Sequence, residues 1–245
     1  MKQPLLIIGI IVIILIVGGL IYQTFLTYQG LLKDKEAPPK EEPQPKPNGG
    51  STDVPPVGEA PRVRLPKAME GKSIVMLVAF KDFRDEEYFV PRQIFRAAGA
   101  EVKVASDKPG TARGADGGEV PVNLLVKDIN LAEFDAVVFV GGSGAMTYLD
   151  NEESYKVARE AVLQRKLLSA ICISPAILAK AGVLEGKKAT VWNSPTDKSA
   201  VKILEDNGAI FEDKPVIADG KIITGNGPAA AEEFGMTIVE TLTQE

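Results

Sequence analysis

The sequence predicts a three-layer α/β sandwich with a mainly parallel central sheet over residues 69–245. Two observations support this fold class. After Lys72, short apolar runs alternate with amphipathic segments of helical length, which is the pattern of successive βα units. The chain has 245 residues and is 45% hydrophobic, which is enough for one well-packed domain with appendages.

The first 30 residues are predicted to be a membrane anchor. Leu5–Tyr22 contains eighteen residues without a charge, and at 1.5 Å per residue such a helix nearly crosses a ~30 Å hydrocarbon core. A cleaved signal peptide is the alternative, but its apolar region is usually only ~7–15 residues long. Gly18–Tyr22 also contains no A-x-A cleavage site. We therefore expect a single-pass transmembrane helix and a membrane localisation.

The orientation of this anchor follows from the short N-terminus. Lys2 and the α-amine precede the apolar segment, and so short a basic terminus usually stays in the cytosol. The basic residues on the other side are mixed with acidic ones, so their number alone does not decide the topology. We expect the folded domain to be extracytoplasmic.

Residues 31–68 are predicted to form a linker rich in Pro, Lys and Glu. Nine of the seventeen prolines of the chain fall between Pro38 and Pro66. Proline favours extended polyproline II backbone, and interspersed charges oppose collapse. The linker should therefore act as a semi-rigid tether between the anchor and the domain.

The elements of the domain are expected in a βα order. Short runs rich in Val, Ile and Leu predict buried strands, and longer amphipathic segments predict helices. In chain order these are strand Ser73–Ala79, helix Glu86–Ala98, strands Glu101–Ala105 and Asp135–Val140, helix Asn151–Lys166 with Asn151 as its N-cap, strand Leu167–Ile171 and a helix from Ser174. Glycine-containing turns in 107–123 and 213–224 predict two small β-hairpin additions.

Composition excludes several classes of site. The chain contains no histidine, which excludes a Ser-His-Asp triad, a Cys-His dyad and histidine-based zinc sites. The single cysteine excludes an intrachain disulfide and a metal site of several cysteines. With 28 basic against 33 acidic residues and no basic run, nothing indicates binding of nucleic acid. The sequence predicts no metal and no cofactor.

Three strand-to-helix junctions carry residues that could do chemistry. Cys172 follows an apolar strand and precedes a helix, whose positive end and nearby amides favour the thiolate. Gly141 and Gly142 follow another strand, where glycine lets the backbone approach a ligand. Glu87 lies in the acidic start of the first helix. Each feature also has a structural explanation: a buried small thiol, a turn, and acids that complement a helix dipole.

The order and surroundings of these residues resemble the DJ-1/PfpI family of the class I glutamine amidotransferase-like superfamily. The resemblance covers about 175 residues and rests on Glu87 four residues before Pro91, and on the motifs DAVVFVGG (135–142), AICISP (170–175) and TGNGP (224–228). It implies a flavodoxin-like or Rossmann-like arrangement of the sheet. It also implies a homodimer formed near the cysteine.

The resemblance assigns roles to individual residues. Cys172 matches the cysteine that the family holds in a strained turn, with its sulfur exposed in a shallow pocket. Glu87 matches the glutamate that hydrogen-bonds this sulfur, as a protonated carboxyl that donates to a thiolate. Gly142 and Ile173 match the positions whose amides form an oxyanion-hole-like nest. Three further residues are expected to line the pocket: Gly141, Ser143 and Trp192.

The chain also departs from the family. Members with protease-like or chaperone-like properties have histidine where this chain has Ile173, and other members have one near Trp192. Three functions remain open: a thiol-dependent enzyme acting on small carbonyl or acyl compounds, a redox sensor whose Cys172 is oxidised to a sulfinic acid, and a pseudoenzyme that binds a partner. The identity of any small-molecule ligand is not predicted.

Overall fold

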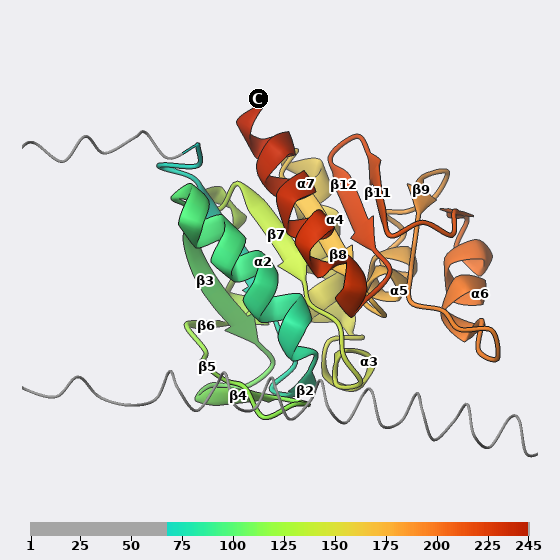
Figure 1. Ribbon diagram of the computed structural model, residues 1–245, viewed down its shortest axis with the longest axis horizontal. Coiled ribbons are helices and arrows are strands. Elements are labelled where there is room, and N and C mark those ends of the chain that lie inside the picture. The colour runs from blue at the N-terminus through green and yellow to red at the C-terminus, as the bar shows by residue number, and fades with distance from the viewer. Residues whose placement is uncertain (1–67, 245) are drawn as a thin grey trace, which may run out of the picture. The chain divides into compact units, whose positions relative to one another are not determined.

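A computed structural model describes residues 68–244 (Figure 1). Its centre is a seven-stranded sheet in the order β11-β12-β8-β7-β1-β3-β6. The strands are β1 (Ser73–Leu77), β3 (Glu101–Ser106), β6 (Leu124–Leu125), β7 (Ala136–Phe139), β8 (Leu167–Ile171), β11 (Val216–Asp219) and β12 (Ile222–Gly225). All neighbours pair in parallel except β11 and β12. The predicted α/β fold with a mainly parallel sheet is confirmed.

Helices cover both faces of the sheet. In Figure 1, α2 (Asp85–Ala98) and α7 (Ala231–Thr243) lie side by side on one face, and these two helices pack together. The opposite face is covered by α4 (Glu152–Leu163) and α5 (Pro175–Lys180), and α6 (Ser199–Asp206) packs against α5. Alternate residues of β1 enter the two hydrophobic cores, since Val75 packs with α4 and α5 whereas Met76 packs with α2 and α7.

Two smaller sheets flank the main one. The strands β2 (Lys81–Phe83), β4 (Thr111–Gly114) and β5 (Glu119–Pro121) form the first, and β9 (Lys188–Ala189) and β10 (Ile210–Phe211) form the second. The hairpin predicted in 107–123 is therefore present as β4 and β5. The hairpin predicted in 213–224 also forms, but it is not a separate addition. Its strand β12 pairs in parallel with β8 and so belongs to the central sheet.

Most predicted elements occur within a few residues of their expected bounds. Asn151 caps α4 as expected, and its Oδ1 accepts a hydrogen bond from the Ser154 amide at 3.1 Å. The prediction that this helix continues to Lys166 was wrong, because it ends at Leu163 and Arg165 has a left-handed φ of 54°. A short helix, α3 (Ala145–Tyr148), and the 3-10 turns η1 (Val126–Asp128), η2 (Leu131–Glu133) and η3 (Pro228–Ala230) complete the described elements.

Both hydrophobic cores consist of residues that lie within 68–244. The buried apolar residues of these cores run from Met69 to Leu242. The predicted anchor, and the predicted linker up to residue 67, lie outside the described residues. Within 68–244, no helix combines the length and the apolar character that a membrane span requires.

Candidate active site around Cys172

Cys172 lies directly after β8, in a tight turn that leads into α5. Its φ of 63° is left-handed, which costs a non-glycine residue free energy and is common at functional sites. Two backbone hydrogen bonds hold this conformation: the Cys172 amide donates to the Gly225 carbonyl at 2.9 Å, and its carbonyl accepts from the Trp192 amide at 2.7 Å. The strained turn that the resemblance implies is present. The residue is only 9% exposed, so it is more enclosed than the exposed sulfur that the resemblance implies.

Glu87 contacts this thiol from the first turn of α2. It is the third residue of α2, and it is fully buried. Its carboxyl hydrogen-bonds the Cys172 side chain, and its Oε2 accepts from the Gly141 amide at 3.1 Å. Oε1 is buried without a hydrogen-bond partner among the described residues. A buried carboxylate oxygen in that position is costly, which favours the protonated carboxyl.

Two glycines allow the three segments to meet. A Cβ on Gly141 would lie 2.5 Å from the Cys172 Cβ and 2.6 Å from Glu87 Oε2, so no other residue fits there without displacing the pair. Gly142 has a φ of 102°, and a Cβ on it would lie 2.4 Å from the Arg84 amide nitrogen. The glycines are therefore required by the geometry of the site.

Burial shifts the pKa of both members of the pair upward. Desolvation raises the pKa of Glu87 to about 7, although the hydrogen bond from Cys172 and the charge of Arg84 act against it. Desolvation, and then the charge and hydrogen bond of Glu87, raise the pKa of Cys172 to about 12. The amides of Gly142 and Ile173 lower the Cys172 pKa, as expected for a nest around the sulfur.

We expected the positive end of the following helix to lower the pKa of Cys172. This expectation was wrong, because the pKa of Cys172 is raised on balance. The following helix α5 has only six residues, and burial outweighs the two amides. Glu87 and Cys172 instead titrate as a coupled pair, in which burial raises the pKa of both groups and the carboxyl loses its proton well before the thiol does. Near neutral pH the carboxylate is therefore available to take the thiol proton.

A cavity of about 310 Å³ opens onto Cys172. It is lined by Arg84, Gly142, Ser143, Met146, Cys172, Ile173 and Trp192. The predicted pocket residues Ser143 and Trp192 are among these. The prediction that Gly141 lines the pocket was wrong, because its amide instead donates to Glu87 Oε2 and the residue is not part of the cavity wall. The sequence interpretation did not include Arg84 and Met146, although a basic residue immediately before an acidic helix start was a usable signal for Arg84.

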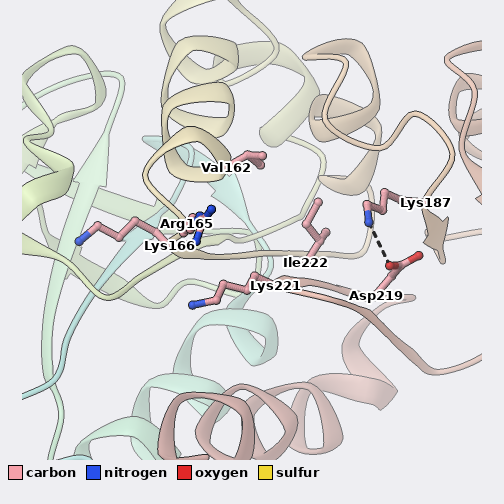
Figure 2. Close-up of a pocket in the computed structure, with 7 residues that line it drawn as sticks. All are labelled: Val162, Arg165, Lys166, Lys187, Asp219, Lys221 and Ile222. Atoms are coloured by element: carbon pink, nitrogen blue, oxygen red, sulfur yellow. Dashed lines mark hydrogen bonds and ion pairs between the residues drawn. The ribbon is translucent and has the colours of Figure 1, made fainter. Parts of the chain in front are cut away.

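A second cavity, of about 320 Å³, lies at the amino-terminal ends of β8 and β12 (Figure 2). It is lined by Val162, Arg165, Lys166, Lys187, Asp219, Lys221 and Ile222. Lys166 and Lys221 directly precede β8 and β12, whereas Cys172 follows the other end of β8. In Figure 2 Lys187 reaches Asp219, and the ion pair measures 3.2 Å. This cavity contains neither the thiol nor a carboxyl of raised pKa, so we assign the candidate chemistry to Cys172.

The family model described as DJ-1/PfpI family matches residues 72–241 of the chain. The chain belongs to the DJ-1/PfpI family. This match includes Glu87, the Gly141–Gly142 turn and Cys172. The predicted resemblance is thus confirmed at the level of the family.

Relatives in the DJ-1/PfpI family align over almost their whole length. A protein of Methanocaldococcus jannaschii is 39% identical over 71% of this chain and 84% of that protein. A protein named deglycase from Pyrococcus horikoshii is 32% identical over 63% of this chain and 90% of that protein.

Solved structures of the DJ-1/PfpI family support the same fold. A ThiJ/PfpI domain protein from Brachyspira murdochii is 33% identical with a TM-score of 0.67, and the match covers 71% of this chain and 99% of that chain. Drosophila melanogaster DJ-1beta is 28% identical with a TM-score of 0.63, over 71% and 91% of the two chains.

Proposed function

We propose that the domain carries out thiol-dependent chemistry on small reactive carbonyl compounds. The observation that carries this proposal is the contact of a strained Cys172 with a carboxyl whose pKa is raised to about 7. A general base works best when its pKa lies near the pH at which it operates. Relatives named deglycase, at 32% and 30% identity, support the same class of chemistry.

The first step is an addition in which the electrons balance without an oxidant. Cys172 Sγ forms a bond to the carbonyl carbon while its proton passes to the Glu87 carboxylate. The π electrons of the carbonyl move to oxygen, and the amides of Gly142 and Ile173, which hydrogen-bond the sulfur, would stabilise that oxyanion. Return of the proton from Glu87 gives a hemithioacetal. Isomerisation or hydration of a small aldehyde can then use the same carboxyl.

Peptide hydrolysis is not part of this proposal. It requires a group that accepts the thiol proton and then protonates a poor amine leaving group near neutral pH, for which imidazole is well suited. The chain contains no histidine, and the apolar Ile173 and Trp192 line the cavity instead. We therefore expect no cleavage of casein.

The test is consumption of methylglyoxal by the purified chain and by Cys172→Ser. We expect slow loss of methylglyoxal that falls to background in the serine variant, since a hydroxyl is a much weaker nucleophile than a thiol at this carboxyl. Equal consumption by both proteins would refute the proposal. Cleavage of casein that depends on Cys172 would show that the proposed proton chemistry is wrong.

A redox-sensing role is the second candidate. A structure described as oxidised Toxoplasma gondii DJ-1 is 28% identical to this chain, with a TM-score of 0.61. The amides of Gly142 and Ile173 that face the sulfur also suit the oxygens of a sulfinate. Exposure to hydrogen peroxide followed by mass spectrometry tests this role. A stable gain of two oxygen atoms on Cys172, without methylglyoxal turnover, would favour the sensor over the enzyme.

We further propose that residues 5–22 anchor this domain in a membrane and that the domain is extracytoplasmic. The support is the uncharged apolar segment and the proline-rich linker that follows it. Protease treatment of intact cells tests the topology. Cleavage within residues 38–66 would support an external domain, and full protection that is lost when the cells are opened would contradict it.

A further inference from the structure

Arg84 brings a positive charge to the cavity in front of Cys172. It directly precedes α2, and its amide donates to the Gly141 carbonyl at 3.0 Å. Its backbone is therefore tied to the same turn that holds Glu87. Arg84 lines the cavity together with Cys172, Ile173 and others.

The remainder of the cavity wall carries no charge. Among the described residues that line it, Arg84 is the only charged one, and its neighbours are small or apolar: Gly142, Ser143, Met146, Ile173 and Trp192. The charge of Arg84 also reaches Glu87, whose pKa it lowers. A ligand that enters the cavity therefore meets one guanidinium, one thiol and largely apolar walls.

Arg84 forms an ion pair with Asp116, but its guanidinium can still bind another anion. Its Nη1 lies 3.2 Å from Asp116 Oδ2, and the two side chains are 38% and 55% exposed. Ion pairs at this exposure contribute only ~0–1 kcal/mol, so the pair with Asp116 is a weak competitor for another anion. A guanidinium has five N–H donors, and its fork matches the two oxygens of a carboxylate.

We propose that Arg84 binds the carboxylate of the substrate, so that the site selects small oxo acids over neutral aldehydes. This rests on the function proposed above and names its substrate class. The carbonyl carbon of such a compound would face Cys172 while its carboxylate contacts Arg84. A neutral carbonyl compound lacks the second contact and should bind less well.

Iodoacetate and iodoacetamide test this selection directly. They have nearly the same size and differ mainly in that iodoacetate carries a carboxylate. Either reagent forms a bond from Sγ to its CH₂ carbon and releases iodide, and the thiol proton passes to Glu87. Because Cys172 is the only cysteine of the chain, labelling of the intact protein reports on this site alone. The ratio of the two rates cancels any effect of a variant on the reactivity of the thiol itself.

In the full chain, we expect Arg84→Gln to lower the ratio of iodoacetate to iodoacetamide labelling about tenfold, as for the loss of one charge-assisted hydrogen bond. Arg84→Lys should retain part of the preference, since it keeps the charge but not the fork. Lys81→Gln is the matched control, because Lys81 is exposed and lines a different cavity. It should leave the ratio unchanged.

The outcomes separate this inference from the proposed function. If iodoacetamide labels Cys172 and the ratio is the same in the natural chain and in Arg84→Gln, the role of Arg84 is refuted and the nucleophile stands. The role of Arg84 is also refuted if Lys81→Gln lowers the labelling ratio as much as Arg84→Gln does. If neither reagent labels Cys172 in the natural chain between pH 6 and 9, the proposed function fails and this inference fails with it.

Discussion

At the scale of single residues, the enclosed carboxyl of Glu87 determines how the site responds to pH. Its Oε1 is buried without a partner among the described residues, and the Gly141 amide holds Oε2. The pKa of the Glu87 carboxyl is therefore higher in the folded state than in the unfolded chain. This difference should appear both in stability and in reactivity.

The stability of the domain should fall as the pH rises from about 4.5 to about 7. The pKa of Glu87 is raised from 4.5 to about 7 by burial, so the folded state binds more protons than the unfolded state across this window. The contribution is fully present below the unfolded pKa and is lost as pH rises through the folded one. The shift corresponds to about 3 kcal/mol at ~1.4 kcal/mol per unit.

Urea unfolding of residues 69–245 at pH 5 and pH 7.5 measures this effect. Glu87→Gln should remove most of the dependence, because an amide does not titrate. Glu86→Gln is the control, since Glu86 is the exposed neighbour in the same helix turn. A pH dependence that survives in Glu87→Gln would show that other groups cause it.

At the scale of elements, the site depends on how closely the turn after β7 approaches the turn after β8. Gly141→Ala should lower the rate of Cys172 alkylation at least tenfold and destabilise the domain by ~1–3 kcal/mol, as is usual for overpacking. The reason is the 2.5 Å approach of the new Cβ to the Cys172 Cβ. Rate measurements with iodoacetamide and urea unfolding check both effects.

Gly182→Ala is the control for this substitution. Gly182 has a φ of 79° but open space around its Cβ position, so the variant should be strained without any change at Cys172. A normal alkylation rate in Gly141→Ala would mean that the two turns are not as tightly joined as described.

The sequence was a good guide to elements and a poorer guide to their surroundings. The apolar run Leu167–Ile171 predicted β8 with its observed bounds, and Asn151 correctly predicted the start of α4. The placement of β12 inside the sheet could not be predicted locally, because it depends on pairing with β8, more than fifty residues earlier.

The candidate site shows the same limit. The resemblance brought Cys172 and Glu87 together, and the geometry of the structure agrees with it. The raised pKa of Cys172 was not predicted, because burial depends on the packing of several segments. A helix terminus, in contrast, can be recognised in the sequence. Arg84 was missed because its place at the cavity depends on the hydrogen bond of its amide to the Gly141 carbonyl, more than fifty residues later.

At the scale of the whole molecule, the folded domain should be independent of the N-terminal segment. Both hydrophobic cores consist of residues between Met69 and Leu242. Deletion of residues 1–30 should therefore release a soluble protein with the circular dichroism and unfolding midpoint of the intact domain, whereas the full chain should partition with membranes. Recovery of the full chain in the soluble fraction would contradict the proposed anchor.

The central claim is that Cys172 is a nucleophile whose proton is taken by Glu87, and its most direct test is the rate of iodoacetamide labelling between pH 5 and 9. We expect the rate in the natural chain to rise with a midpoint near pH 7, where the pair loses its first proton. Glu87→Gln should lose this inflection and react appreciably only at pH values above the ~8.5 of a free thiol, because burial still raises the pKa of Cys172, while Glu86→Gln should follow the natural profile. An identical profile in the natural chain and in Glu87→Gln would contradict the account.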